Sequence, residues 1–319
     1  MNIILMLVFL IGGFVLLVKG ADFFVDGACA ISEKLKIPAY LVGMTVVALG
    51  TSLPEAAVSI TASIQGSNEI AIGNVIGSNT FNTLVVLGSS ALIAPIAVKK
   101  EIVKRDFPFC IFITAVMLAL MITLNGGDDY AISRIGGVIL LALFAVFMTF
   151  SIVSGKKNAA HMVEVAEDKK PMSTAKCILL VLLGIAGVIA GGELTVYGAK
   201  ALALMAGLSE KVVALTVVAI GTSLPELVTS IVAARKKQND IAVGNVIGSN
   251  IFNILFILGI SATISPIPTD IASMIDGLIL TGIMTVTYVF TLIGKKINRI
   301  EGGVMILMYV AYTAYLLVR

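Results

Sequence analysis

Two acidic residues lie inside strongly apolar stretches of this sequence, and each ends a nearly identical segment. The two segments are Thr45-Val-Val-Ala-Leu-Gly-Thr-Ser-Leu-Pro-Glu55 and Thr216-Val-Val-Ala-Ile-Gly-Thr-Ser-Leu-Pro-Glu226. An ionisable side chain at membrane depth is energetically costly, so a carboxylate found there is functional by default. The doubled carboxylate therefore predicts a membrane protein that handles ions.

A helix-breaking proline stands directly before each acid. Pro54 and Pro225 have no backbone N–H, and each pushes the preceding leucine towards an extended conformation. A transmembrane helix broken here frees carbonyl groups, which persist at that depth only if they line a cavity or bind something. The carbonyls that we expect to be freed are those of Ala48, Thr51, Ala219 and Thr222. A cation is their simplest partner.

Hydroxyl and amide side chains accompany the acids. Thr51 and Ser52 precede Glu55 by about one helical turn, a spacing that places side chains on one face of a helix. Thr222 and Ser223 repeat this arrangement before Glu226. The next apolar stretch of each half carries a polar stripe at i, i+4 and i+8, namely Asn74, Ser78 and Asn82, and then Asn245, Ser249 and Asn253. Glycines 73 and 77 are expected to let the two helices approach closely.

These donor atoms are all oxygens or amides, because the motifs contain no thiol and no histidine. Such a set suits hard cations such as Na⁺ and Ca²⁺, the latter taking about 6–8 oxygens, rather than soft or borderline metals. Two carboxylates neutralise one Ca²⁺, whereas three Na⁺ would leave a charge of about +1. If one Ca²⁺ and three Na⁺ were bound together, their positive charge would exceed the negative charge of the two carboxylates and would stay uncompensated in a low dielectric. The site is therefore predicted to hold Na⁺ and Ca²⁺ in turn, as an antiporter requires.

The elements that must position these residues are apolar runs long enough to cross a bilayer. Of the 319 residues 58% are hydrophobic and 13% charged, against about 25% charged in soluble proteins. Ten runs are expected, at 2–18, 38–64, 70–94, 107–124, 132–153, 173–192, 210–233, 241–265, 274–293 and 300–318. They leave almost no chain for a soluble domain.

The two halves of the chain are copies of each other. Residues 43–96 match 214–267 without a gap at 33 of 54 positions. Each half holds five spans, and an odd number inverts the second copy in the membrane, a common design of secondary transporters. The predicted fold is an all-α membrane protein of ten transmembrane helices, in two inverted five-helix repeats with broken helices at the ion site. The expected units are a first repeat (1–153), a cytoplasmic linker (154–172) and a second repeat (173–319).

The placement of basic residues predicts the topology. With the N-terminus outside, 18 of the 22 basic residues, Lys19 among them, fall in loops on the cytoplasmic side. The positive-inside rule then places both termini outside. The acids Asp22, Asp26 and Glu193 are expected near span ends, at the membrane interface, with an ion access path along Asp22 and Glu193 as the alternative.

Other classes of function have little support. No nucleophile, nucleotide-binding loop or metal triad indicates an enzyme or a cofactor, and the three cysteines have no metal or redox spacing. The basic residues lie in short loops, so nucleic acid is not an expected partner. The expected partners are Na⁺, Ca²⁺ and the lipid bilayer, with the monomer as the functional unit.

At the doubled motifs the chain resembles the cation/calcium exchanger superfamily, and its prokaryotic sodium/calcium exchanger branch most. The resemblance is carried by Gly50-Thr-Ser-Leu-Pro-Glu55, Gly73-Asn-Val-Ile-Gly-Ser-Asn79 and their second copies, and it extends over essentially the whole chain. It implies Na⁺-driven Ca²⁺ transport by alternating access in a prokaryotic plasma membrane, with about three Na⁺ per Ca²⁺.

The same resemblance implies a set of ligands. Calcium ligands carry over to Glu55 and Glu226 with the carbonyls of Thr51 and Thr222. Sodium ligands carry over to Ala48, Ser52, Ser78, Ala219, Ser223 and Ser249, and the polar pair is Asn82 and Asn253. Some relatives have an aspartate at the position of Asn253, and in the potassium-dependent branch an acid there accompanies K⁺ use. Asn253 thus argues against K⁺ co-transport and leaves the coupling ratio open.

Two alternatives remain at this stage. The cation/proton branch uses similar glutamates, so a Ca²⁺/H⁺ antiporter is the main alternative, although the serine-rich set favours Na⁺. A passive cation channel is a weaker alternative, because inverted repeats favour a carrier.

Overall fold

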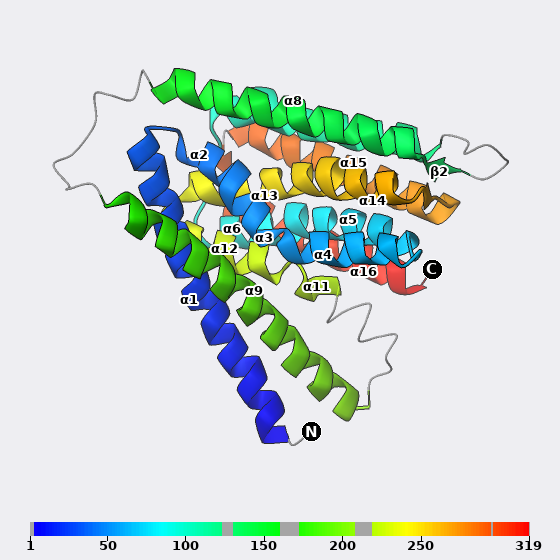
Figure 1. Ribbon diagram of the computed structural model, residues 1–319, viewed down its shortest axis with the longest axis horizontal. Helices are drawn as coiled ribbons and strands as arrows, with labels where there is room; N and C mark the ends of the chain where they lie inside the picture. Colours follow the sequence, from blue (N-terminus) through cyan, green and yellow to red (C-terminus); the bar gives the residue numbers. More distant parts are fainter. Residues whose placement is uncertain (1–2, 123–129, 160–171, 208–218, 295, 319) are drawn as a thin grey trace.

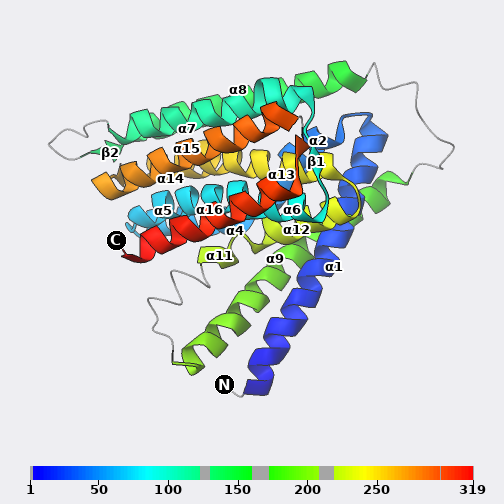
Figure 2. The same ribbon diagram turned by 180° about the vertical axis from the view of Figure 1, so that it is seen from behind.

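The computed structural model describes residues 3–122, 130–159, 172–207, 219–294 and 296–318, and over these residues it is almost entirely helical. Most helices lie nearly parallel to one another (Figure 1). Helices α1 and α9 are the exception, since they lie side by side and leave the bundle obliquely in both views (Figures 1 and 2). The predicted all-α membrane fold in two repeats is confirmed.

The first repeat contains five helical segments, some of them built from several pieces, with η marking a π-helical piece. They are α1 (Ile3–Leu35); α2 (Ala39–Val42), η1 (Gly43–Val47), α3 (Ala48–Thr51) and α4 (Leu53–Ile64); α5 (Glu69–Phe81), η2 (Asn82–Val86) and α6 (Leu87–Ile93); η3 (Ile102–Asp106) and α7 (Phe107–Met121); and α8 (Arg134–Ala159). Two short strands, β1 (Ile96–Ala97) and β2 (Ala131–Ile132), lie between them.

The second repeat follows the same order. Its segments are α9 (Thr174–Met205); α11 (Ala219–Gly221) and α12 (Leu224–Arg235); α13 (Asn239–Phe252), η5 (Asn253–Ile257) and α14 (Leu258–Ile264); α15 (Ile271–Gly294); and α16 (Arg299–Val318), with strands β3 (Ile267–Pro268) and β4 (Lys296–Ile297). Residues 160–171, which hold most of the predicted linker, lie outside the described residues, and α8 continues to Ala159.

Seven helices of the described chain are long and apolar enough to cross a membrane, and the bent pair Ala39–Thr51 and Leu53–Ile64 makes an eighth candidate. Of the other two predicted spans, 107–124 corresponds to the shorter helix α7 with η3 before it. The start of 210–233 falls in residues 208–218, outside the described part. Helices α1 and α9 are longer than predicted, with 33 and 32 residues, because helical structure continues past the predicted ends to Leu35 and Met205.

The strand pairs display the inverted symmetry of the repeats. Strand β1 pairs antiparallel with β4, and β2 pairs antiparallel with β3. Each pair thus joins one repeat to the other, and the two pairs lie near opposite ends of the bundle (Figures 1 and 2). Helices also pair across the repeats. Helix α6 of the first repeat packs on α16 of the second, and α14 of the second repeat packs on α8 of the first.

Glycines bring α1 and α9 into close backbone contact. A Cβ atom on Gly184 would lie 2.6 Å from the Cα of Phe24, and one on Gly20 would lie 2.5 Å from the backbone nitrogen of Val188. Small residues permit this approach in membranes, where association relies on van der Waals packing. The two first helices of the repeats therefore form one tightly packed pair.

The centre of the bundle is the segment from α13 to α14, whose residues are almost wholly buried. It packs on α2, η1 and α3 of the first repeat. Gly244 and Gly248 face that contact, since an added Cβ would meet the backbone oxygens of Tyr40 and Met44 respectively. The sequence predicted this role for Gly73 and Gly77, where nothing among the described residues lies within 4 Å of an added Cβ; the repeat counterparts of Tyr40 and Met44, Lys211 and Leu215, lie outside the described residues. Close packing at these glycines is thus seen in the second copy of the motif, and for the first copy it stays a prediction.

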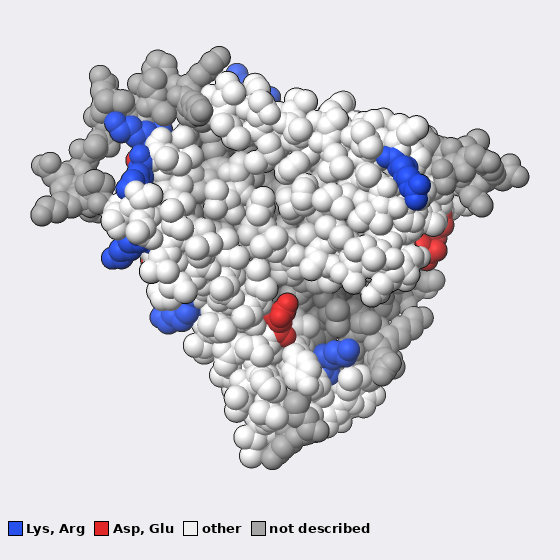
Figure 3. Space-filling model, viewed as in Figure 1, with Lys and Arg blue, Asp and Glu red and all other residues white. Residues whose placement is uncertain are grey.

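Charged side chains are sparse on the face seen in Figure 3, and most of its basic residues gather at one end. This is what the positive-inside argument requires of the loops that join the helices there. Several members of the predicted set lie at helix ends rather than in loops, such as Lys34 and Lys176, and Lys19 is misplaced because it lies in the middle of α1. The direction in which the termini face stays a prediction.

Candidate ion-binding site

Each motif breaks its helix directly before the acid. Helix α3 ends at Thr51 and α4 begins at Leu53, with a bend of 50° between the two halves. In the second repeat α11 ends at Gly221 and α12 begins at Leu224. Ser52 and Ser223 occupy the breaks, with φ and ψ of −85° and 8° and of −93° and 6°. Each proline falls in the first turn of the new helix, where its missing N–H costs nothing.

The breaks place each glutamate opposite the serine of the other repeat. Ser52 donates a hydrogen bond from Oγ to Oε1 of Glu226 over 2.7 Å. Reciprocally, the Oγ of Ser223 lies 2.9 Å from Oε1 of Glu55. Both carboxylates are completely buried. The two copies of the motif therefore form one site at the interface of the repeats, as the sequence predicts.

One oxygen of each carboxylate has no partner. Oε2 of Glu55 and Oε2 of Glu226 are buried and make no hydrogen bond in the described structure. Leaving a buried charged oxygen unpaired is strongly unfavourable. Two such atoms in a site built from symmetric halves mark positions where a cation would bind.

Serines and asparagines of the following helices complete the surroundings. Ser78 lies 3.2 Å from Ser223, and Ser249 lies 3.4 Å from Oε1 of Glu226. Asn82 and Asn253 are fully buried. Among the described residues, both polar atoms of the Asn82 amide lack a partner, as does Oδ1 of Asn253, whereas Nδ2 of Asn253 donates to Oδ1 of Asn79 over 3.0 Å.

The carbonyl groups at the breaks differ between the repeats. The carbonyl of Ala48 accepts the N–H of Ser52 over 3.0 Å and lies 3.3 Å from the Thr51 hydroxyl, so the break does not free it as expected. In the second repeat the N–H of Ser223 turns to Ile220 over 3.2 Å, which leaves the carbonyl of Ala219 without that donor. Thr51 is buried, while Thr222 is half-buried and lines a cavity.

That cavity, of about 360 Å³, lies between α4, α9 and the break before α12. It touches Pro54, Thr222 and Pro225, and Glu193 and Lys200 of α9 also line it. The cavity therefore borders the prolines next to both glutamates, and Glu193 lies on its wall.

Sequence reasoning missed the π-helical pieces. η2 begins at Asn82 and η5 begins at Asn253, the two positions of the polar pair. Such bulges occur frequently at functional sites because they re-aim side chains within a helix. No residue type marks a π-helical turn, although the repetition of Asn at both starts was visible in the sequence.

Comparison with known proteins extends over nearly the whole chain. A family model described as "Sodium/calcium exchanger protein" matches residues 5–153 and 176–318. The chain is 37% identical to the putative antiporter CaxA of Alkalimonas amylolytica, covering 96% of each protein. It is 32% identical to the sodium/calcium exchanger MaX1 of Methanosarcina acetivorans, covering 95% of this chain and 96% of that one.

A solved structure of the sodium-calcium exchanger NCX_Mj superimposes with a TM-score of 0.85 at 34% identity. The match covers 99% of this chain and 100% of that one. The inverted repeats, the broken helices and the buried glutamates described above thus lie within a region that matches from end to end.

Proposed function

This chain belongs to the sodium/calcium exchanger protein family, and on that premise we propose that it exchanges Na⁺ for Ca²⁺ across a membrane at the site between its repeats. The observation that carries the proposal is the pair of buried carboxylates, each bonded to the opposite repeat and each with one unpartnered oxygen. A multi-pass membrane transporter of this family is a carrier rather than an enzyme.

The charge of the site accounts for exchange rather than co-transport. Glu55 and Glu226 together balance one Ca²⁺, and their four carboxyl oxygens supply part of the roughly 6–8 oxygens that this ion requires. The carbonyls of Thr51 and Thr222 add further ligands. If Na⁺ ions use the same carboxylates, the two loads exclude each other, because their summed charge is uncompensated in a buried site.

Sodium ions are assigned to the hydroxyl and carbonyl oxygens around the carboxylates. These come from Ser52, Ser78, Ser223 and Ser249 with the carbonyls of Ala219 and Ala48, and the Ala48 carbonyl has to give up a hydrogen bond to Ser52 or Thr51 when it binds the ion. About three Na⁺ per Ca²⁺ makes transport electrogenic. Asn82 and Asn253 contribute amide oxygens but no third negative charge, so K⁺ is not a substrate.

Alternating access follows from the inverted repeats, which give the protein two related conformations around one site. We place the protein in a prokaryotic plasma membrane as a functional monomer, with both termini outside and no cofactor besides the transported ions.

Removal of the serine hydroxyls will weaken Na⁺ binding. We expect Ser52→Ala and Ser223→Ala each to raise the Na⁺ concentration for half-maximal exchange by about tenfold, because each loses a Na⁺ ligand and a hydrogen bond to a charged group. The measurement is Na⁺-dependent Ca²⁺ efflux from proteoliposomes. Ser63→Ala is the matched control, since the one bond of the buried Ser63 hydroxyl within the described part of the chain is to the carbonyl of Ser59 in its own helix. If all three variants showed the same Na⁺ dependence, Ser52 and Ser223 would not be Na⁺ ligands.

The proposed exchange is tested with purified protein in liposomes. Vesicles loaded with Na⁺ and diluted into Na⁺-free medium should accumulate Ca²⁺, whereas a pH gradient alone should drive none. Clamping the membrane potential with valinomycin and K⁺ should change the rate, because transport of three Na⁺ per Ca²⁺ moves net charge. Uptake driven only by the pH gradient would identify a Ca²⁺/H⁺ antiporter instead, and Ca²⁺ flux that needs no counter-ion would identify a channel.

A further inference from the structure

The buried amide of Asn245 contacts both halves of the ion site without being one of its proposed ligands. Its Oδ1 accepts the hydroxyl of Thr51 over 3.1 Å, from the other repeat. Its Nδ2 donates to the Ser230 hydroxyl over 3.0 Å and comes within 3.5 Å of the backbone carbonyl of Glu226. Every polar group of this side chain therefore faces either a residue of the motif or the turn that follows it.

The first repeat contains the same contact to its own glutamate. Nδ2 of Asn74 donates to the Ser59 hydroxyl over 2.9 Å and approaches the carbonyl of Glu55 to 3.3 Å. Ser59 and Ser230 each lie four residues after the glutamate of their repeat. A contact repeated by two copies of opposite orientation is a property of the site rather than of one local helix packing.

We infer that Asn245 is a positioning residue of the exchanger, which fixes the first turn of α12 and the Thr51 side of the break against each other. Thr51 supplies a carbonyl and Glu226 a carboxylate to the bound Ca²⁺. Asn245 sets the separation of these two ligands across the repeat interface, and Asn74 holds the turn of Glu55 within the first repeat. This inference rests on the proposed function.

A buried asparagine can also serve packing alone, away from the ion site, and Asn68 is an example. Asn68 also joins the repeats, since its amide donates to Ser265 over 2.8 Å and to the carbonyl of Pro266 over 3.0 Å. Its contacts are with a connecting segment and not with the motif. Asn68 is thus a matched control, a buried cross-repeat amide away from the glutamates.

The test measures Ca²⁺ dependence of exchange in proteoliposomes for Asn245→Ala, Thr51→Val and the double variant. Asn245→Ala should raise the KM for Ca²⁺ about tenfold, the effect of one hydrogen bond of about 1.4 kcal/mol, with the rate at saturating Ca²⁺ nearly unchanged. Thr51→Val removes the same bond from its other end and preserves side-chain volume. The double variant should be no worse than the worse single variant, because both changes remove one shared interaction.

Asn68→Ala should lower the unfolding temperature and leave the KM for Ca²⁺ unchanged. A wild-type KM in Asn245→Ala, or additive effects in the double variant, would overturn the inference. If Asn245→Ala does not fold, the KM of Thr51→Val decides in its place. Absence of Na⁺-driven uptake by the wild type would reject the proposed function itself, and the two failures are therefore distinct.

A different contact lies at the end of α12, where Lys236 meets α1. Its Nζ bonds to Oδ1 of Asp26 over 2.7 Å and to the backbone carbonyl of Asp22 over 3.1 Å, and lies 3.4 Å from Oδ1 of Asp22. All three side chains are at least partly exposed. The contact ties the α1 and α9 pair to a helix that carries one of the two central glutamates.

The inverted repeat has no ionic equivalent of this contact. The counterparts of Asp22 and Asp26 are Glu193 and Tyr197, and that of Lys236 is the uncharged Gln65. Glu193 and Tyr197 line the open cavity. Lys236 thus supplies a cation that can hold one end of the molecule closed. The corresponding position at the other end, Gln65, carries no charge.

We propose, as a second inference that rests on alternating access, that Lys236 with Asp22 and Asp26 forms an ionic clasp that favours the conformation with the α9 cavity open. Exposed ion pairs contribute about 1 kcal/mol or less each. The clasp therefore biases the equilibrium of the two conformations and leaves both accessible.

Labelling of a cysteine in the cavity measures this bias. In a variant without the native cysteines, Ala57→Cys lines the cavity and reports its openness to a membrane-impermeant maleimide. Lys236→Gln and Asp26→Asn should each slow labelling about two- to fivefold, whereas Arg235→Gln, a change at the exposed neighbour, should not. Labelling at the parent rate in Lys236→Gln, or equal slowing by Arg235→Gln, would overturn the clasp.

Discussion

Glu55→Gln and Glu226→Gln are each expected to reduce Na⁺-driven Ca²⁺ exchange at least about 100-fold. Both carboxylates are completely buried and form one site. With one of them neutralised, a bound Ca²⁺ keeps a net positive charge in a low dielectric, and an uncompensated buried charge costs about 3–5 kcal/mol. That cost corresponds to more than two orders of magnitude in affinity. The measurement is Ca²⁺ uptake by proteoliposomes under an outward Na⁺ gradient.

The glutamine side chain preserves the shape of the site and an oxygen that accepts the bond from Ser52 or Ser223, so the variants test charge rather than packing. Glu69→Gln is the control, because Glu69 likewise occupies the first turn of a helix but is exposed. It should exchange Ca²⁺ at the parent rate. Full exchange in either Glu55→Gln or Glu226→Gln would exclude a two-carboxylate site.

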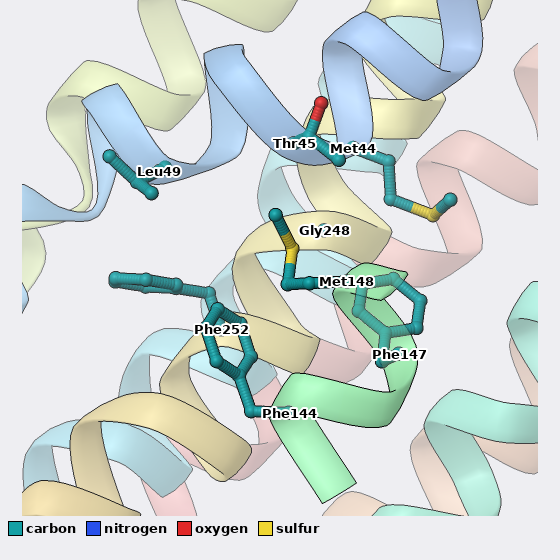
Figure 4. Close-up of a pocket in the computed structure, with 8 residues that line it drawn as sticks. All are labelled: Met44, Thr45, Leu49, Phe144, Phe147, Met148, Gly248 and Phe252. Atoms are coloured by element: carbon teal, nitrogen blue, oxygen red, sulfur yellow. The ribbon is translucent and has the colours of Figure 1, made fainter. Parts of the chain in front are cut away.

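Gly248→Val is expected to destabilise the protein by at least about 3 kcal/mol, or several degrees in Tm, and to abolish exchange. An added Cβ would lie 2.7 Å from the Cβ of Ala48 and 2.6 Å from the Cα of Met44. Figure 4 shows Gly248 on α13 beside the helix that carries Met44, Thr45 and Leu49, with side chains of α8 close by. The crevice that these residues line has a volume of about 10 Å³, too small to accept a side chain. The helix that leads to Thr51 and Ser52 must move instead.

The matched change is Gly282→Val on α15, where no atom of the described chain lies within 4 Å of an added Cβ. Thermal unfolding followed by size-exclusion chromatography compares the two variants in the same detergent. Gly282→Val should elute and unfold as the wild type does. A Gly248→Val variant with the wild-type profile would mean that α13 and α3 do not pack as described.

The architecture of the site was predictable because the motif that forms it occurs twice in the sequence. The recurrence of Pro-Glu in apolar surroundings predicts two broken helices, and the odd number of spans predicts that the copies face each other. The structure bears out both arguments through the reciprocal bonds of Ser52 with Glu226 and of Ser223 with Glu55. Spacing within one segment indicates a shared helix face, but it does not say which repeat supplies the partner.

Other features were beyond the reach of sequence patterns. Gly244 is in close contact with the backbone of Tyr40, and the motif alone did not show which helix it would meet, because packing depends on the neighbouring helix and not on the residue type. The carbonyl of Ala48 remains hydrogen-bonded at a break that was expected to free it. The length of α1, which runs past Lys19 to Leu35, was missed because hydropathy identifies the apolar part of a helix and not its polar continuation.

Competition between the two ions for binding is the most direct test of a shared site. The measurement is an equilibrium Ca²⁺ titration of the purified protein at increasing Na⁺ concentrations, with choline replacing Na⁺ to hold ionic strength constant. A site in which Glu55 and Glu226 serve both ions predicts that Na⁺ shifts the Ca²⁺ isotherm to higher concentrations without changing the number of Ca²⁺ bound at saturation. A Ca²⁺ isotherm that saturating Na⁺ leaves in place would show that the two ions bind independently and would contradict the shared site.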